Sequence, residues 1–350
     1  MKELVIGDLV AKVPIIQGGM GVGVSLGGLA GAVAKEGGIG VISAAQPGFR
    51  EDDFYTNTFE ANMRALNREI KKAKEISNGG IVGVNIMVAV THYSDFVKCC
   101  IDSGADIIIS GAGLPMDLPK FAEGSDIKLA PIVSSAKACK LILGRWIKKF
   151  NKVADLVVIE GPKAGGHLGF KVDEISEKQD NYDNDIKEII ACVKNFEEST
   201  GKKIPVVFAG GVFDRKDIDH CFELGLDGVQ MATRFVATEE CDAAPAYKQA
   251  YVNAKKEDIE IVTSPVGMPG RAIHNAFLEK VAQQKEHITH CFRCLEKCNP
   301  TQAPYCITQA LIRAVEGDVE NGLIFCGDNV QYLDHIGTVE EVVHALFPES

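Results

Sequence analysis

His167 is the residue of this sequence whose type and surroundings best suit proton transfer. It ends the run Ala164-Gly165-Gly166-His167, which follows the apolar stretch Leu156–Glu160. Imidazole has an ordinary pKa of about 6.5, so it can take up or release a proton near neutral pH. A histidine on a surface loop is usually only a surface residue, but a loop that follows a buried strand lies at the catalytic edge of an α/β fold. We therefore predict that His167 is an acid/base residue.

Small residues and glycines recur in the same position, just after apolar stretches. Glycine allows backbone N–H groups to approach an anion closely, and a helix that begins there adds a favourable dipole. One glycine pair alone would more simply indicate a tight turn. Because most of the stretches end this way, we predict a bound cofactor that carries a phosphate, with these candidates at the stretch ends: Gly18, Gly19, Met20, Asn85, Gly111, Glu160, Gly165, Gly166, Gly210, Gly211, Ala232 and Thr233.

Four cysteines form a second candidate site, with the spacing Cys291-x2-Cys294-x3-Cys298-x7-Cys306. Four thiolates so spaced can hold an iron–sulfur cluster or a structural zinc ion. The opening of the segment resembles the [4Fe–4S] segment of dienoyl-CoA reductases, although the last spacing differs. We predict a [4Fe–4S] cluster, with zinc and free thiols as alternatives. His287 and His290 lie just upstream and are alternative ligands or ordinary surface residues.

The elements that must position these residues alternate along the chain. Short apolar, β-branched runs predict eight strands: Val13–Gln17, Ile39–Ser43, Ile81–Ile86, Asp106–Ser110, Lys128–Val133, Leu156–Glu160, Ile204–Ala209 and Gly228–Met231. Helical periodicity between them predicts helices at Phe59–Ile76, Ser94–Ser103, Ala136–Lys149, Asn184–Glu198 and Lys216–Leu224. Continuous apolar strands favour a parallel sheet covered by helices, and eight of them close a (β/α)8 TIM barrel.

An open dinucleotide-binding sheet is the rival fold. The glycine-rich run Gly19-Met20-Gly21-Val22-Gly23 lacks the G-x-G-x-x-G spacing, and the second strand ends in Ser43-Ala44-Ala45, without an acidic residue for a ribose hydroxyl. Both differences favour the barrel.

The alternation stops after Phe235, so we divide the chain into a barrel, residues 1–235, and a helical cap, residues 236–350, that carries the cysteines. The cap begins with a turn-rich stretch, Thr263–Arg271. Arg271 has two interpretations that the sequence leaves open. It could contact an anionic substrate or a nucleotide phosphate, or it could be a solvated arginine that closes the turn.

Composition limits the class of protein. The chain has 350 residues, 46% of them hydrophobic, and a net charge of −11, which argues against a nucleic-acid surface. The N-terminus has no secretory signal pattern and no apolar run is long enough to span a bilayer. With eleven cysteines and no leader, we expect reduced thiols and a cytoplasmic protein that binds neither nucleic acid nor membrane.

Five motifs together resemble one enzyme family: Gln17-Gly18-Gly19-Met20, Gly83-Val84-Asn85-Ile86-Met87, Ala164-Gly165-Gly166-His167, Ala209-Gly210-Gly211 and Ala232-Thr233-Arg234-Phe235. They are similar to the motifs of the nitronate monooxygenases, and also of the flavin-dependent enoyl-ACP reductases, over about residues 5 to 275. The resemblance implies a barrel that binds FMN. Gly18, Gly19 and Met20 would line the flavin ring and Asn85 would bond to it. Gly210, Gly211, Ala232 and Thr233 would hold the phosphate, with Gln230 close by.

The resemblance implies an FMN-dependent oxidoreductase that oxidises alkyl nitronates, with His167 as the acid/base residue. The alternative is an enoyl-ACP (enoyl thioester) reductase that uses FMN, NADH or NADPH and an iron–sulfur cluster. A flavin- or metal-binding sensor without catalytic activity is a third hypothesis. The expected substrate is thus a small molecule or an acyl thioester. A homodimer is among the expected oligomeric states.

Overall fold

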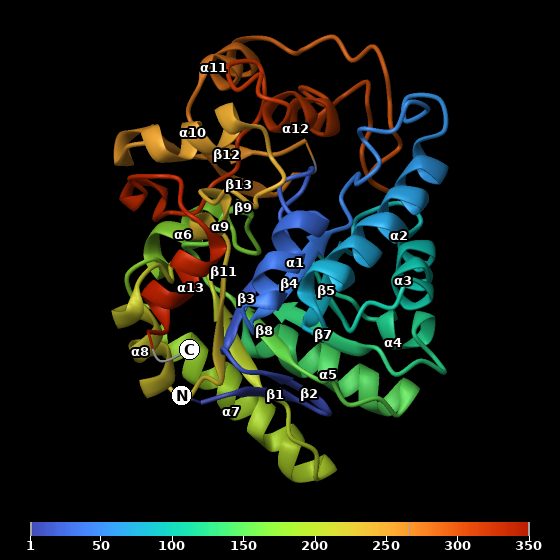
Figure 1. Ribbon diagram of the computed structural model, residues 1–350, viewed down its shortest axis with the longest axis vertical. Coiled ribbons are helices and arrows are strands. Elements are labelled where there is room, and N and C mark those ends of the chain that lie inside the picture. The colour runs from blue at the N-terminus through green and yellow to red at the C-terminus, as the bar shows by residue number, and fades with distance from the viewer. Residues whose placement is uncertain (1, 266, 349–350) are drawn as a thin grey trace.

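Eight parallel strands form a closed barrel at the centre of the computed structural model, which describes residues 2–265 and 267–348 (Figure 1). Around the ring, the strands follow one another in the order β3 (Ile15–Gln17), β4 (Ile39–Ser43), β5 (Ile81–Met87), β6 (Ile107–Gly111), β7 (Lys128–Val133), β8 (Val157–Glu160), β10 (Val206–Ala209) and β11 (Gly228–Met231). The predicted barrel and its eight strands are confirmed.

The strands are apolar on both faces because each face packs against a different partner. Ile107 and Ile109 of β6 point into the barrel, whereas Ile108 between them packs against the surrounding helices. This division follows from the two-residue repeat of a strand. It explains why the strands have continuous hydrophobic sequences.

A short hairpin, β1 (Leu4–Ile6) and β2 (Leu9–Ala11), closes the amino-terminal end of the barrel. Leu4, Ile6 and Ala11 belong to the same buried cluster as the inward-facing strand residues. Lys128, the first residue of β7, forms an ion pair with Asp8 in the hairpin turn. The opposite, carboxyl-terminal end of the barrel therefore remains available for a site.

Helices surround the barrel, and the five predicted ones are confirmed as α2 (Thr58–Ser77), α3 (Tyr93–Asp102), α5 (Ala136–Phe150), α7 (Asp183–Thr200) and α8 (Arg215–Glu223). The sequence reading missed α1 (Gly27–Lys35), whose small residues conceal its periodicity. These small residues let α1 pack very closely on β4, since a Cβ at Gly40 would lie 1.7 Å from the carbonyl oxygen of Ala30. Short helices α4 (Leu118–Phe121), α6 (Val172–Lys178) and α9 (Thr233–Val236) lie in connections.

The last helix of the chain, α13 (Val339–Leu346), lies on the barrel wall (Figure 1). It packs against α1 and α9, and Arg215 of α8 donates a hydrogen bond to the carbonyl oxygen of Leu346. Because α9 has only four residues, α13 covers the part of the wall that a full helix after β11 would cover in a regular barrel.

The cap over the carboxyl-terminal end contains α10 (Pro245–Asn253), α11 (Ala276–Gln283), α12 (Ile307–Val315) and the 3-10 turns η1 (Lys256–Asp258) and η2 (Val330–Tyr332). It also contains strands, which we did not predict: β12 (Ile259–Thr263) and β13 (Pro269–Ile273) pair antiparallel, and β13 pairs with β9 (Gly166–His167) from the barrel. The turn between β12 and β13 includes Val266, which lies outside the described residues. Within the described part of the chain, no helix is long and apolar enough to cross a membrane.

Candidate active site

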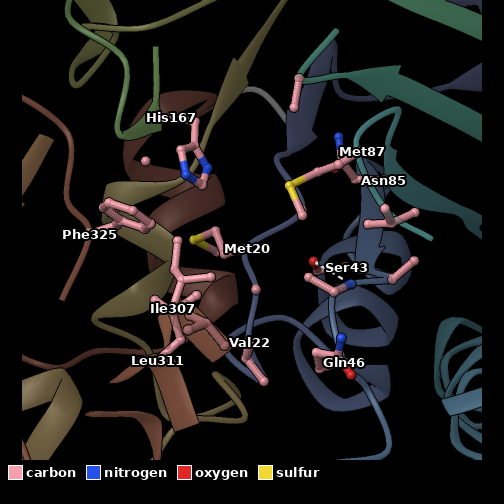
Figure 2. A pocket seen from close by; sticks show the side chains of 18 of the residues that line it. Met20, Val22, Ser43, Gln46, Asn85, Met87, His167, Ile307, Leu311 and Phe325 are labelled. Atoms are coloured by element: carbon pink, nitrogen blue, oxygen red, sulfur yellow. Dashed lines mark hydrogen bonds between the residues drawn. The ribbon is translucent and has the colours of Figure 1, made fainter. Parts of the chain in front are cut away.

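A cavity of about 750 Å³ lies between the carboxyl-terminal ends of the barrel strands and the cap. All fourteen residues that we predicted for catalysis and cofactor binding line it. Figure 2 shows Met20, Ile307, Leu311 and Phe325 near one another, with Ser43, Gln46 and Asn85 across the cavity. The cavity therefore has one apolar wall, supplied largely by the cap, and one more polar wall, supplied by the barrel.

Close backbone approaches at glycines shape the inner part of this cavity. A Cβ at Gly19 would lie 2.5 Å from the Cβ of Asn85, and one at Gly111 would lie 2.9 Å from Ile132. A Cβ at Gly18 would approach the side chain of Gln230 within 3.3 Å. The Gln230 side-chain oxygen is buried without a hydrogen-bond partner there. The backbone at these glycines therefore packs directly against its neighbours, and the buried Gln230 oxygen offers a polar contact to a flat ring bound in the cavity.

The loops after β10 and β11, where we predicted the phosphate corner, line the same cavity. Gly210 and Gly211 have φ values of +109° and +98°, which glycine adopts readily and other residues rarely do. A Cβ at Gly210 would lie 2.8 Å from the carbonyl oxygen of Gly161. Asn329 donates a 2.6 Å hydrogen bond to the carbonyl oxygen of Gly211 and so fixes this loop. The residues present fit a ring with an attached phosphate such as FMN.

His167 is held between the barrel and the cap. It lies in β9, opposite Gly270 of β13, and its Nε2 is 2.7 Å from Oγ of Ser264. The ring of Phe325 packs edge-on against the imidazole, with 5.1 Å between the ring centres. Burial lowers the pKa of His167 to about 4, so the ring is neutral at neutral pH. A neutral imidazole can accept a proton from a substrate.

Glu160, at the end of β8, lines the same cavity. Burial raises the pKa of its carboxyl group to about 7, and the backbone N–H of Gly169 gives it only a long hydrogen bond of 3.4 Å. Glu160 therefore holds a proton over much of the pH range in which His167 is neutral. The connection that follows β8 thus offers one group able to accept a proton and one able to donate it.

The structure supports neither of the two interpretations of Arg271 that the sequence left open. Its side chain is 2% exposed, donates hydrogen bonds to the carbonyl oxygens of Pro162 and Ala164, and lies 3.6 Å from the carboxylate of Asp328. It therefore ties the loop before His167 to β13 and to the chain after Phe325. Its role is to hold the His167 loop in place.

The arrangement of the four cysteines does not support the predicted iron–sulfur or zinc centre. Among the residues that the structure describes, no three His, Cys, Asp or Glu side chains gather closely enough to hold a metal ion. Cys294 is hydrogen-bonded to Thr308, and Cys306 is the residue directly before the first turn of α12, whereas Cys291 is exposed and Cys298 is half-buried.

The segment that contains these cysteines instead closes one side of the cavity. Thr91, after β5, donates a 3.2 Å backbone hydrogen bond to the carbonyl oxygen of Cys294, and its hydroxyl donates to that of Arg293. His290 packs against Tyr55 and Phe292, with 5.4 and 4.6 Å between ring centres, and His287 is exposed. The segment with the cysteine spacing is thus a loop that hydrogen bonds and ring contacts hold on the barrel.

Sequence reasoning missed the cavity residues that come from the cap. Among them are Ile307, Leu311 and the segment 325–329, and Ser264, which bonds to His167, was missed as well. The one local signal was Gly327-Asp328-Asn329, a turn sequence after the apolar stretch Leu323–Phe325. Nothing in their spacing indicates that they meet His167, because their place depends on how the cap folds back.

The closed barrel, its cavity and the family and structural matches together indicate an oxidoreductase of the flavin type. A sequence profile of the family described as nitronate monooxygenase matches residues 2–349, so the chain belongs to the nitronate monooxygenase family.

Similar proteins agree with this assignment. A probable nitronate monooxygenase of Staphylococcus saprophyticus subsp. saprophyticus is 26% identical over 81% of this chain and 82% of its own length. A (3aS,4S,5R,7aS)-5-hydroxy-7a-methyl-1-oxo-octahydro-1H-indene-4-carboxyl-CoA dehydrogenase of Mycobacterium tuberculosis is 25% identical over 77% of this chain and 65% of its own length. The solved structure of FabK from Thermotoga maritima superposes with a TM-score of 0.74 at 26% identity, over 97% of this chain and 93% of that one.

Proposed function

We propose that the protein is an FMN-dependent oxidoreductase that oxidises alkyl nitronates, with His167 as its acid/base residue. The observation that carries the proposal is the place of His167, in the wall of the cavity whose inner part fits a flavin. Gly18, Gly19, Met20, Asn85 and Gln230 would hold the ring. Gly210, Gly211, Ala232 and Thr233 would hold the phosphate.

A bound flavin would supply the electron transfer, and the residues of this chain would handle protons and position. The neutral His167 ring would accept the proton from the carbon next to the nitro group of a nitroalkane, which leaves the nitronate, or would return that proton in the reverse direction. Ser264 would keep the imidazole ring of His167 from rotating, because its Oγ hydrogen-bonds to Nε2 at 2.7 Å. The cap would exclude water, since α12 and Phe325 cover the cavity with apolar side chains.

A second candidate is the reduction of an enoyl thioester, with NADH or NADPH as the source of electrons. The apolar wall of Ile307, Leu311 and Phe325 favours it, because a small nitronate would leave much of this wall uncovered whereas an acyl chain would cover it. The M. tuberculosis relative, whose name specifies a carboxyl-CoA compound, gives this candidate further support. In this reaction His167 would protonate the carbon next to the thioester carbonyl.

Rapid mixing under anaerobic conditions tests the two candidates. The flavin absorbance of the purified holoenzyme is followed after mixing with an alkyl nitronate, with NADH or with NADPH. Bleaching by the nitronate, followed by reoxidation with oxygen, is the expected result. Bleaching by a nicotinamide alone, followed by reoxidation with an enoyl thioester, would replace the first proposal by the second.

A further inference from the structure

Two cysteines outside the active site face each other across two helices of the barrel wall. Cys139 lies on α5 and Cys192 lies on α7, and the Cys139 thiol hydrogen-bonds to the Cys192 sulfur. The Cys192 sulfur also lies 3.8 Å from the carbonyl oxygen of Ala136, one turn before Cys139. The helices are packed side by side, so the two sulfurs are held together by the fold.

The two thiols differ in their exposure to solvent and in how readily they ionise. Cys139 is fully buried, whereas Cys192 is half-buried and so within reach of a small oxidant. The hydrogen bond from Cys139 lowers the pKa of Cys192, and the nearby Lys140 lowers it further, although partial burial opposes both. Cys192 thus has the features of an attacking thiolate. Cys139 has those of a resolving thiol, which lies next to it.

We propose that Cys139 and Cys192 form a reversible oxidation site, in which a hydroperoxide converts the thiol pair into a disulfide between α5 and α7. The Cys192 thiolate attacks the peroxide oxygen, the O–O bond breaks, and a sulfenic acid and one water result when hydrogen peroxide is the oxidant. The Cys139 thiol then attacks the sulfenic sulfur, and a second water leaves. Two thiols lose two electrons in total, and the peroxide gains them.

The disulfide would join two helices that flank the segment carrying His167. α5 follows β7, α7 follows the His167 segment after β8, and the pair lies outside the cavity. Closing a loop of this length reduces the freedom of the unfolded chain. We therefore expect the oxidised protein to be more resistant to unfolding than the reduced one, and a thiol reductant to reverse the effect.

Peptide mapping of the holoenzyme tests the site. After brief treatment with hydrogen peroxide and alkylation of the remaining thiols, trypsin should release residues 138–140 linked to residues 188–194, with two hydrogens fewer than the separate peptides. The link should disappear after reduction and in Cys192→Ser. A wild-type digest in which Cys192 becomes oxidised without this link would overturn the proposal.

Two further measurements extend the test, and the first of them needs no variant. In untreated wild type, Cys192 should react with iodoacetamide at least about tenfold faster than Cys99, which is also half-buried but whose pKa is raised by burial. In Cys139→Ala, a sulfenic acid should persist at Cys192 and be trapped by dimedone. Equal alkylation of Cys192 and Cys99 would remove the basis of the proposal.

Discussion

His167 and Ser264 are 97 positions apart in the chain, yet Nε2 of the histidine lies 2.7 Å from Oγ of the serine. The pairing of β9 with β13 brings the two loops together. The barrel thus provides the proposed acid/base residue, and the cap provides the hydroxyl group that lies against it. Neither part alone contains this pair.

Replacing Ser264 by alanine should reduce kcat by about 2- to 30-fold, because a lost hydrogen bond to a buried ring costs about 0.5–2 kcal/mol. KM should change little, whereas the lower limb of the pH–rate profile should move. Ser264→Thr should restore part of the rate. Ser199→Ala, at an exposed position on α7, is the matched control. Unchanged kcat and pH profile in Ser264→Ala would show that Ser264 does not position His167.

His167→Ala should lower turnover on the true substrate by about 10²- to 10⁴-fold, the usual contribution of a positioned acid/base residue. The flavin content should stay the same, since the glycine-lined part of the cavity does not depend on the imidazole. Steady-state kinetics and flavin absorbance per chain measure both quantities. His344→Ala, on the exposed side of α13, serves as control. Full activity in His167→Ala would remove His167 from the mechanism.

Gly210→Ala should abolish or greatly weaken flavin binding. The new Cβ would lie 2.8 Å from the carbonyl oxygen of Gly161, inside the phosphate corner. Gly225→Ala separates this effect from backbone strain, because Gly225 has a similar φ of +95° but no atom within 4 Å of a Cβ. Flavin retained per folded chain after gel filtration is the measurement. Equal losses in the two variants would point to strain alone.

The raised pKa of Glu160 predicts a pH-dependent stability. Its pKa is about 7 in the folded protein and ordinarily 4.5, so the folded state binds more protons between these values. The contribution of Glu160 is therefore full below pH 4.5 and is lost as the pH rises through 7. Relative to wild type, Glu160→Gln should gain about 1 to 3 kcal/mol in free energy of unfolding between pH 4.5 and 8.

Denaturant unfolding at several pH values measures this difference. Glu223→Gln, on the exposed surface of α8, should show no such trend. A constant difference between Glu160→Gln and wild type across this range would mean that the Glu160 carboxyl ionises normally.

The barrel and the inner part of the site could be predicted from the sequence because both are local. Each strand is a continuous apolar run, and each run is followed directly by the residues that line the cavity, such as Asn85 after β5 and Gly210 after β10. In a parallel barrel all such ends meet at one rim. Knowing where a strand ends is therefore enough to place its neighbours in the site.

The cap could not be predicted in the same way. Ser264 and Phe325 reach His167 only because β13 pairs with β9, and a two-residue strand such as β9 has no recognisable pattern. For a related reason, the cysteine spacing alone did not determine where the four thiols lie. Spacing shows which thiols can converge, but the backbone bonds to Thr91 and the thiol bond to Thr308 decide where Cys294 points.

The position of α13 has a consequence for how the chain folds during synthesis. Val339, Val342, Val343 and Leu346 are buried on the barrel wall, although the last barrel strand ends more than a hundred positions earlier. A ribosome releases the chain from its amino end at about 5–20 residues per second, so the wall stays open for several seconds after all eight strands have emerged. During that interval the apolar side of α1 is exposed, and the nascent barrel is vulnerable to aggregation.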